Sequence, residues 1–337
     1  YCNSVLQALY YCKPFRECVL NYQTGAGAMV SHYPLSPTTP AFSIHSASKS
    51  MFLCLQDLFQ RIQNHSKKTQ YFTPTAFVAK VKKENELFRS SMHQDAHEFL
   101  MFIMSAITED IEADIKKSQK EFEDNMPKAF ITNGSYGHKK VWVQKLFEGQ
   151  LTNEIKCLTC EKTTNRAESF MDLSLDIEQN SSVTSCLRQF SASEMLCHKD
   201  KFYCDECCGL QEAEKRMKIQ VLPNILSLHL KRFKYQEALQ KYVKLSYRVS
   251  FPMELRLFNT VDEMEDPDRI YDLNAFVVHV GSGPHHGHYV AVVKHQDRWL
   301  LFDDENVETI DESDIHKYFG DSSQLGSGYV LFYQARD

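Results

Sequence analysis

A histidine and two carboxylates in the last sixth of the sequence could together perform acid–base chemistry. His288 stands in a glycine-rich turn between two apolar stretches that predict paired strands, and Asp303 and Asp304 follow Trp299-Leu-Leu-Phe. A histidine oriented by a carboxylate is two-thirds of a nucleophilic triad, in which the histidine takes the proton of the nucleophile. We therefore interpret His288 as a general base and Asp303 as the residue that fixes its tautomer. Asp304 is either a substitute for Asp303, a contact near an oxyanion, or an ordinary carboxylate at the end of a strand.

Two pairs of cysteines have the spacing of metal ligands. Cys157 and Cys160 form one Cys-x-x-Cys knuckle, and Cys204 and Cys207 form another. Each knuckle lets two thiolates converge on one ion, and two knuckles complete the four-sulfur shell that zinc prefers. Because four protein ligands leave no open position, we expect one structural Zn²⁺. The alternatives are unrelated cysteines and a redox dithiol, and the latter is disfavoured because no thioredoxin-like unit surrounds either pair.

The elements that must position these residues show two kinds of sequence pattern, one helical and one strand-like. Helical spacing of apolar residues predicts helices at the start of the chain, with Ser4 as a candidate cap, and at residues 51–62 and 93–115. From Val141 onward, short apolar or alternating stretches predict strands. Residues 24–47 are rich in glycine, serine and proline and predict a loop. The layout is a helical lobe followed by a strand-rich lobe, with the paired cysteines between them.

Composition excludes several classes of protein. The 337 residues are 43% hydrophobic and 24% charged, as in an ordinary globular protein. Neither a membrane-length apolar run nor a basic-then-apolar leader is visible, so we expect no membrane. The net charge of −6 argues against nucleic acid and for a basic partner surface. Eleven cysteines are too few for a disulfide scaffold, so we expect a reduced, intracellular protein, cytoplasmic with the nucleus as a second location.

Five stretches of the chain form an ordered series of motifs. They are Tyr1–Tyr10, Gln94–Leu100, Leu222–Phe233, the histidine region from Gly287 to Asp304, and Gly328–Tyr333. In this order they resemble the conserved boxes of the ubiquitin-specific proteases, a family of papain-like cysteine deubiquitinases. Both cysteine knuckles fit that family as well.

The resemblance implies an α+β fold, namely a papain-like cysteine protease fold with a helical thumb, a β-rich palm and zinc-braced β fingers. It implies a single catalytic domain over residues 1–337. Within it, residues 1–140 would form the thumb, 141–250 the fingers and the start of the palm, and 251–337 the rest of the palm with the histidine.

The resemblance also implies a position for the nucleophile. In the family a cysteine immediately precedes the tyrosine that aligns with Tyr1, so the nucleophile is expected one position before this sequence begins. Cys2 aligns with a variable position and is not the expected nucleophile. These 337 residues alone are therefore expected to bind ubiquitin without turnover.

The implied activity is that of a thiol protease that hydrolyses the isopeptide bond after the C-terminal glycine of ubiquitin, through an acyl-enzyme. The alternative is a catalytically inactive ubiquitin-binding scaffold of the same fold. A zinc-finger adaptor is disfavoured because the knuckles are embedded in a large two-lobed chain.

A site for the tail of ubiquitin needs acidic groups for its arginines and a constriction that only Gly-Gly can thread. Asp95 and Glu98 are three residues apart in a predicted helix and share one face, next to Gln94 in the same motif. Alternatively, Asp95 and Glu98 belong to an ordinary solvated face of the helix and bind no partner. Gly287 and Tyr289 bracket the histidine and are candidates to line the constriction.

Two further segments are similar to one branch of the family. Residues 247–260 and the phrase Gly281-Ser-Gly-Pro284 resemble the small proteases that are activated by WD40-repeat proteins. The implied partners are ubiquitin, ubiquitinated proteins and a WD40-repeat activator that binds the fingers.

Overall fold

The computed structural model describes residues 1–24, 49–65, 71–90, 92–125, 140–261, 264, 266–283, 286–320 and 325–336. The loop predicted at 24–47 lies outside these residues except for Thr24. The chain divides into two compact units. The first contains residues 1–11, 95–97 and 145–337, and the second contains residues 12–94 and 98–144.

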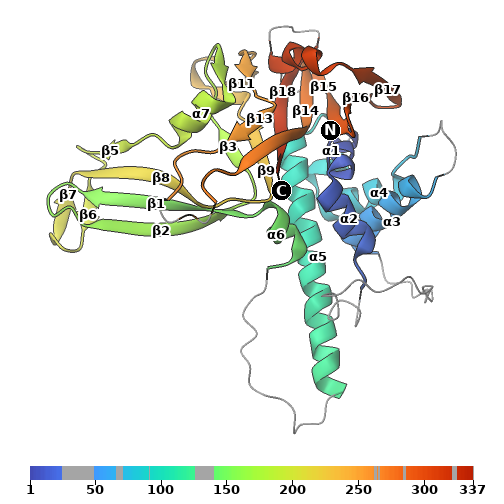
Figure 1. Cartoon of the computed structure of the whole chain (residues 1–337), viewed down its shortest axis with the longest axis horizontal. Coiled ribbons are helices and arrows are strands. Elements are labelled where there is room, and N and C mark those ends of the chain that lie inside the picture. Colours follow the sequence, from blue (N-terminus) through green and yellow to red (C-terminus); the bar gives the residue numbers. More distant parts are fainter. Residues whose placement is uncertain are drawn as a thin grey trace. The chain divides into compact units, whose positions relative to one another are not determined.

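The first unit is built around an eight-stranded sheet (Figure 1). Its strands follow the order β17-β16-β15-β14-β18-β9-β3, and β13 pairs with β14 beside this path. They span Leu173–Leu175 (β3), Ile225–Leu230 (β9), Glu254–Arg256 (β13), Ile270–Gly283 (β14), His286–His295 (β15), Arg298–Asp303 (β16), Asn306–Ile310 (β17) and Ser327–Ala335 (β18). Neighbouring strands are antiparallel except β3 and β9, which are parallel. The consecutive antiparallel strands β14 to β17 therefore bring the β14–β15 and β16–β17 turns to one end of the sheet and the β15–β16 turn to the other.

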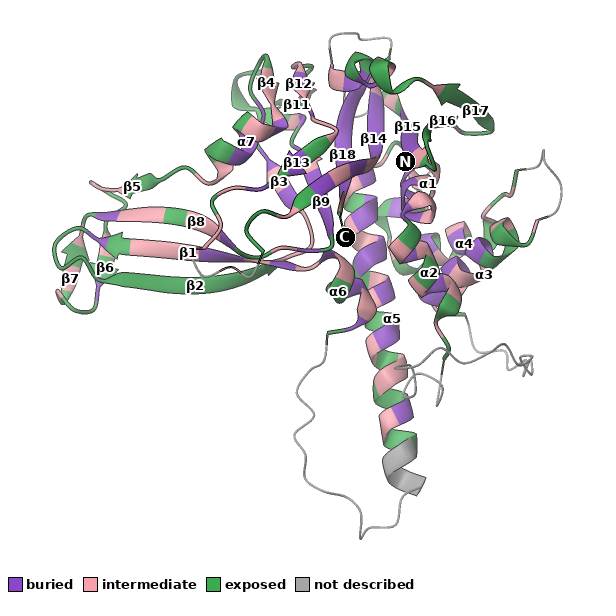
Figure 2. Cartoon of the chain, in the orientation of Figure 1, coloured by how far each residue is buried: buried purple, intermediate pink, exposed green. Residues whose placement is uncertain are grey.

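The central strands of this sheet are buried on both faces. Strands β14, β15 and β18 each contain runs of consecutive buried residues, and Figure 2 shows the runs on β14 and β18 in purple. Continuous apolar sequence is typical of strands that are covered on both sides. Helix α1 (Cys2–Tyr11) contacts β14, β15 and β16. Tyr318, in the 3₁₀ segment η5 (Glu312–Phe319), packs its ring 5.7 Å from that of Phe276.

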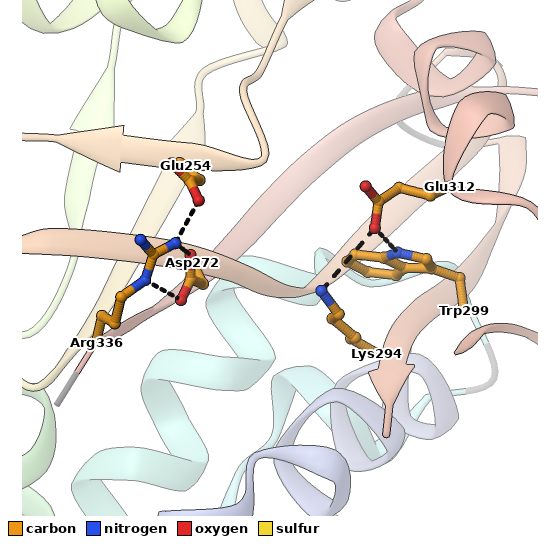
Figure 3. Close-up of polar contacts among 6 residues, drawn as sticks. All are labelled: Glu254, Asp272, Lys294, Trp299, Glu312 and Arg336. Atoms are coloured by element: carbon orange, nitrogen blue, oxygen red, sulfur yellow. Dashed lines mark hydrogen bonds and ion pairs between the residues drawn. The ribbon is translucent and has the colours of Figure 1, made fainter. Parts of the chain in front are cut away.

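Polar side chains fasten the outer strands to their neighbours (Figure 3). Arg336, just after β18, donates from Nε to Asp272 Oδ2 on β14 at 3.0 Å and also donates to Glu254 on β13. The indole Nε1 of Trp299 on β16 donates to Glu312 Oε2 at 3.2 Å. The Arg336 bonds hold the residue after β18 to β14 and β13, and the Trp299 bond holds η5 to β16.

A second, four-stranded sheet in the first unit carries the cysteine knuckles. Its strands follow the order β2-β1-β8-β5 and span Gly149–Cys157 (β1), Thr163–Phe170 (β2), Glu194–Leu196 (β5) and Ala213–Val221 (β8). The small hairpin of β6 (Phe202–Cys204) and β7 (Gly209–Gln211) lies at the far end of the long strands (Figure 1). Strand β2 is exposed over nearly its whole length, as expected for an edge strand with few apolar residues.

Three smaller elements complete the first unit. Strands β10 (Phe233–Gln236) and β11 (Lys241–Lys244) form a hairpin. Strands β4 (Ser181–Ser182) and β12 (Val249–Ser250) pair in parallel. Helix α7 (Val183–Phe190) begins with a capping box between Ser182 and Ser185.

The second unit is helical. Its helices are α2 (Lys13–Asn21), α3 (Met51–Gln63), α4 (Thr75–Glu84), the 3₁₀ turn η2 (Leu87–Arg89) and most of α5 (Ala96–Asn125). Helix α6 (Trp142–Phe147) begins here and ends in the first unit. Aromatic rings fill the core: Phe15 lies 6.2 Å from Phe59 and 5.4 Å from Trp142, centroid to centroid.

The predicted α+β fold is confirmed, with corrections to individual elements. Helix α5 begins three residues later and ends ten residues later than predicted, and α7 is a helix in a region predicted to contain strands. Within the region from Val141 onward that was predicted to form strands, residues 247–251 form a strand only at Val249–Ser250. In the part of the chain that the structure describes, no helix combines the length and apolar character needed to cross a membrane. The division into thumb, fingers and palm at residues 140 and 250 stays a prediction.

Candidate functional site

His288 and Asp303 lie in hydrogen-bond contact at one end of the large sheet. His288 is the third residue of β15 and Asp303 is the last residue of the neighbouring strand β16. Nε2 of His288 lies 2.5 Å from Oδ1 of Asp303, and both side chains are about half exposed. Because a carboxylate can only accept, Nε2 carries the proton, and Nδ1 is the nitrogen left to accept a proton from a reacting group. The structure therefore brings His288 and Asp303 together, and the orienting role of Asp303 stays a prediction.

Asp304 is held beside the same pair by a tight turn. It follows β16 with a positive φ of 50°, in the short connection between the paired residues Asp303 and Asn306. Aspartate tolerates this left-handed conformation better than most residues, which suits a two-residue hairpin connection. The ligand atoms of His288, Asp303 and Asp304 all lie within 4.8 Å of one another.

The first turn of α1 reaches this cluster. Asn3 Nδ2 donates to Asp304 Oδ1 at 3.5 Å, and Gln7 Nε2 in turn donates to Asn3 Oδ1 at 3.4 Å. Asn3 belongs to the first of the five motifs, but its contact with Asp304 could not be read from the sequence. The amino-terminal end of a helix, with its unpaired amide groups, therefore lies beside the candidate base.

Helix α1 starts at Cys2, and Ser4 is not its cap. The backbone amide of Val5 and the hydroxyl of Ser4 both donate to the carbonyl oxygen of Tyr1, at 3.2 and 2.9 Å. Ser4 therefore lies inside the helix and acts as a donor, which corrects its predicted role. Burial raises the pKa of the Cys2 thiol to about 12. A thiol that stays protonated at neutral pH is a poor nucleophile, which agrees with excluding Cys2.

Glycines let β14 and β15 approach closely next to His288. A Cβ on Gly287 would lie 2.6 Å from the carbonyl oxygen of Val280 and 2.7 Å from Cε1 of His279. Gly281 has a φ of +123°, a conformation that side-chain-bearing residues rarely adopt. The strands can pair here only because these positions lack side chains, so the backbone of His288 is closely constrained.

Asp95 connects the start of α5 to the large sheet. Its Oδ1 accepts from the backbone amide of His97 at 2.7 Å, and its Oδ2 accepts from the hydroxyl of Tyr329 on β18. Tyr289, the second candidate next to His288, is buried, and its ring centroid lies 6.0 Å from that of Tyr329. Burial, with a further contribution from the charge of Asp95, raises the pKa of Tyr289. Asp95 and Tyr289 are thus brought together, although sequence reasoning gave no sign of the Tyr329 bridge.

The two other candidates for substrate contacts belong to the second unit. Gln94 donates from Nε2 to Ser90 Oγ at 3.4 Å. Glu98 is exposed in the first turn of α5. The shared role predicted for Asp95 and Glu98 stays a prediction.

A cluster that the sequence did not indicate surrounds His97. Nε2 of His97 lies 2.9 Å from Asp172 Oδ2, and Ser174 Oγ bridges Asp172 at 3.2 Å and His229 Nδ1 at 2.8 Å. The rings of His97 and His229 stack at 3.7 Å and 9°. Parallel stacked rings direct their nitrogen lone pairs side by side rather than toward one point, so the arrangement is a poor metal site. Its partners are 75 and 55 residues apart in sequence, beyond the reach of any local pattern.

Burial and charge set the protonation of this cluster. Burial, together with the nearby His97, lowers the pKa of His229 to about 3, so its ring is neutral at physiological pH. Burial alone would raise the pKa of Asp172, but the hydrogen bond and attraction of His97 outweigh it and hold the pKa below its ordinary value. The cluster therefore contains an ionised Asp172 and a neutral His229.

The four predicted metal ligands converge. Cys157 ends β1 and Cys204 ends β6, while Cys160 and Cys207 lie in the turns that follow. The Sγ atoms of Cys157 and Cys207 lie 4.0 Å apart, those of Cys160 and Cys204 lie 3.5 Å apart, and all four are within 4.8 Å. Zn–S bonds of about 2.3 Å in a tetrahedron place sulfurs about 3.8 Å apart. The four cysteines could therefore hold a zinc ion, and their separations exceed the roughly 2.05 Å of a disulfide bond.

Known proteins are similar to this chain over nearly its whole length. The family model described as "Ubiquitin carboxyl-terminal hydrolase" matches residues 1–333. Ubiquitin carboxyl-terminal hydrolase 4 of Arabidopsis thaliana is 50% identical, over 99% of this chain and 90% of that protein. Ubiquitin carboxyl-terminal hydrolase 12 of Salmo salar is 47% identical, over 100% of this chain and 87% of that protein. The probable ubiquitin carboxyl-terminal hydrolase creB of Aspergillus flavus is 45% identical, and this chain spans only 53% of its length.

A solved structure has the same fold. The structure of the SAGA Ubp8/Sgf11/Sus1/Sgf73 DUB module bound to ubiquitin aldehyde matches with a TM-score of 0.73 at 26% sequence identity. The match covers 99% of this chain and 67% of that chain.

Proposed function

Because the chain belongs to the ubiquitin carboxyl-terminal hydrolase family, we propose that it is a thiol protease that cleaves the isopeptide bond after the last glycine of ubiquitin. The observation that carries the proposal is the 2.5 Å contact between His288 Nε2 and Asp303 Oδ1 beside the first turn of α1. This arrangement supplies an oriented base next to the end of a helix that can stabilise a thiolate.

His288 acts as the general base in this mechanism. The Nε2–H group of His288 is hydrogen-bonded to Asp303, so the ring presents Nδ1 to the nucleophilic thiol. Nδ1 then takes the proton of the thiol. The resulting imidazolium is stabilised by Asp303 and later returns the proton to the leaving lysine amine. Deacylation repeats the sequence with water in place of the thiol.

The nucleophile is a cysteine immediately before Tyr1. Asn3 contacts Asp304, so a side chain just before α1 lies at the end of the helix that faces the His288 cluster. The desolvated thiol of Cys2, with its raised pKa, is unsuited to the role. Asp304 either stands in for Asp303 or, through Asn3, orients polar groups near the oxyanion.

The tail of ubiquitin lies along residues on both sides of His288. Gly287 and Tyr289 line the passage for the terminal glycines, and the lack of a side chain at Gly287 lets β14 pack closely beside this passage. Gln94, Asp95 and Glu98 bind the arginines and amides of the tail.

The zinc ion has a structural role. Cys157, Cys160, Cys204 and Cys207 hold it through four thiolates, which leaves no position for a substrate. A bound ion would cross-link the β1–β2 turn to the β6–β7 hairpin. The fingers thereby present a fixed surface to the globular body of ubiquitin.

A WD40-repeat activator binds the fingers in this proposal. The family branch suggested by residues 247–260 supports it, as do the exposed apolar side chains of Tyr203 and Leu210 on the β6–β7 hairpin. Titration of the full-length protein with a candidate WD40-repeat protein should raise the rate of ubiquitin cleavage; no stimulation contradicts the branch assignment.

We also propose an intracellular location, in the cytoplasm with the nucleus as a second site. No disulfide bond joins any of the eleven cysteines, all of which the structure describes, and this fits a reducing compartment.

The rival function is an inactive ubiquitin-binding scaffold. Cleavage of a fluorogenic ubiquitin conjugate by the full-length protein separates the two. We expect turnover that falls about 10²- to 10⁴-fold in His288→Gln, the usual contribution of a general base. The control is His286→Gln, an exposed histidine on the same strand, which should leave the rate unchanged. Ubiquitin binding without turnover favours the scaffold.

A further inference from the structure

Lys244, the last residue of β11, is a partly buried lysine whose ammonium group is bound to backbone. Its Nζ donates to the carbonyl oxygens of His279 at 2.9 Å and Gly281 at 2.8 Å. Burial, with a further contribution from the charge of Arg232, lowers the pKa of Lys244 to about 8. Withdrawing an ammonium group from water is costly unless its hydrogen bonds are satisfied. These two bonds are therefore specific anchors rather than incidental contacts.

The two carbonyls flank the residue that pairs with the candidate base. Val280 of β14 is the cross-strand partner of His288, and the pairing becomes irregular immediately after it. On the other edge of β14, strand β18 starts at Ser327, which is the partner of His279. A Cβ on Gly326 would lie 2.7 Å from the carbonyl oxygen of His279, so this oxygen points to the edge where β18 starts. Pairing between β14 and β18 stops at His279 and Ser327. Lys244 supplies hydrogen-bond donors to β14 at this point, where β18 no longer does.

The β10–β11 hairpin contacts the same segment by a second route. Phe233 is the cross-strand partner of Lys244. Its ring meets that of His279 edge-on, with centroids 5.1 Å apart. His279 is buried and its ring lies against Gly287, the residue before His288. One cross-strand pair thus contacts both the backbone and the side chain of His279.

We propose that Lys244 is a positioning residue for His288. It fixes the carbonyls of His279 and Gly281 and so holds the irregular end of β14. Through the pairing of Val280 with His288, it fixes the backbone from which the imidazole reaches Asp303. This inference rests on the proposed function, in which His288 is the general base.

The kinetic test compares three variants of the full-length protein. Lys244→Met removes the donors but keeps an unbranched side chain, and we expect kcat on a fluorogenic ubiquitin conjugate to fall about tenfold or more with little change in KM. Lys244→Arg keeps the donors and should recover most of the rate. The matched control is Tyr271→Phe, which removes a buried hydrogen bond to the Pro223 carbonyl at the other end of β14; it should keep the wild-type kcat.

A second readout does not depend on activity. In protein with ¹³C-labelled histidine, the ring resonance of His288, assigned with His288→Gln, should shift in Lys244→Met and not in Tyr271→Phe. If Lys244→Met does not fold, Lys244→Gln replaces it, because its shorter side chain cannot reach both carbonyls.

An unshifted His288 resonance, or a kcat equal to that of Tyr271→Phe, overturns the inference. A fully active His288→Gln variant instead overturns the proposed function, whatever the resonances show. The two failures are therefore distinguishable.

Discussion

A single methyl group at Gly287 tests the geometry of the site. In Gly287→Ala the new Cβ would lie 2.6 Å from the carbonyl oxygen of Val280, whereas ordinary contact begins at 3.4 Å. The obstacles are this backbone oxygen and the imidazole ring of His279, which is buried. Strand β15 must therefore move by about 0.8 Å or more, the difference between these distances. That shift separates His288 from Asp303.

The expected effect follows from this displacement. Because a misplacement of about 1 Å can cost about 10²-fold in rate, we expect kcat/KM to fall roughly 30- to 100-fold. Overpacking should also lower the free energy of unfolding by about 1–3 kcal/mol. Both are measured on the full-length protein, by cleavage of a fluorogenic ubiquitin conjugate and by urea unfolding.

The matched control lies in the same hairpin. A Cβ on Gly283 would meet no atom within 4 Å, so Gly283→Ala should behave as wild type in both assays. If Gly287→Ala is as active as Gly283→Ala, the close approach of the strands does not constrain His288 and the reasoning is refuted.

Three further predictions concern the metal, the Asp95 bridge and pH. Cys204→Ser should abolish binding of one zinc ion per chain, measured by mass spectrometry of metals. The control Cys208→Ser should retain the zinc, because the Cys208 thiol is hydrogen-bonded to a backbone carbonyl. Zinc retained by Cys204→Ser would count against the four-cysteine site. Tyr329→Phe removes the donor to the Asp95 carboxylate and should lower the free energy of unfolding by about 1.5–3 kcal/mol; an unchanged urea midpoint would contradict this. His229 has a folded pKa of about 3 against an ordinary value of 6.5, so only the unfolded chain takes up its proton as pH falls below 6.5, and stability is lost down to about pH 3. Between pH 7.5 and 5 this should lower the free energy of unfolding by about 2 kcal/mol, and an equal loss in His229→Gln would show that another group is responsible.

Local patterns in the sequence identified the parts of the site that depend on local geometry. The Cys-x-x-Cys spacing predicted the convergence of four sulfurs because each knuckle is a single turn. The separation of His288 and Asp303 predicted their contact because adjacent antiparallel strands bring such residues together.

Contacts between distant segments could not be predicted in this way. Tyr329 and Asp95 are 234 residues apart, and Lys244 reaches β14 from a separate hairpin. Neither contact produces a periodic pattern in the sequence, because a hydrogen bond needs only one donor and one acceptor. Helix α7 is different, because the sequence contains a local signal for it. Ser182 and Ser185 form its capping box, and Val183, Cys186 and Leu187 have helical spacing and are buried.

The most direct test of the central claim identifies the nucleophile. The full-length protein is treated with ubiquitin that carries an electrophile in place of its C-terminal carboxylate, and the adduct is digested and mapped by mass spectrometry. The mechanism predicts one covalent adduct, on a cysteine immediately before Tyr1, formed more slowly in His288→Gln. An adduct on Cys2, or none on the residue before Tyr1, would contradict it.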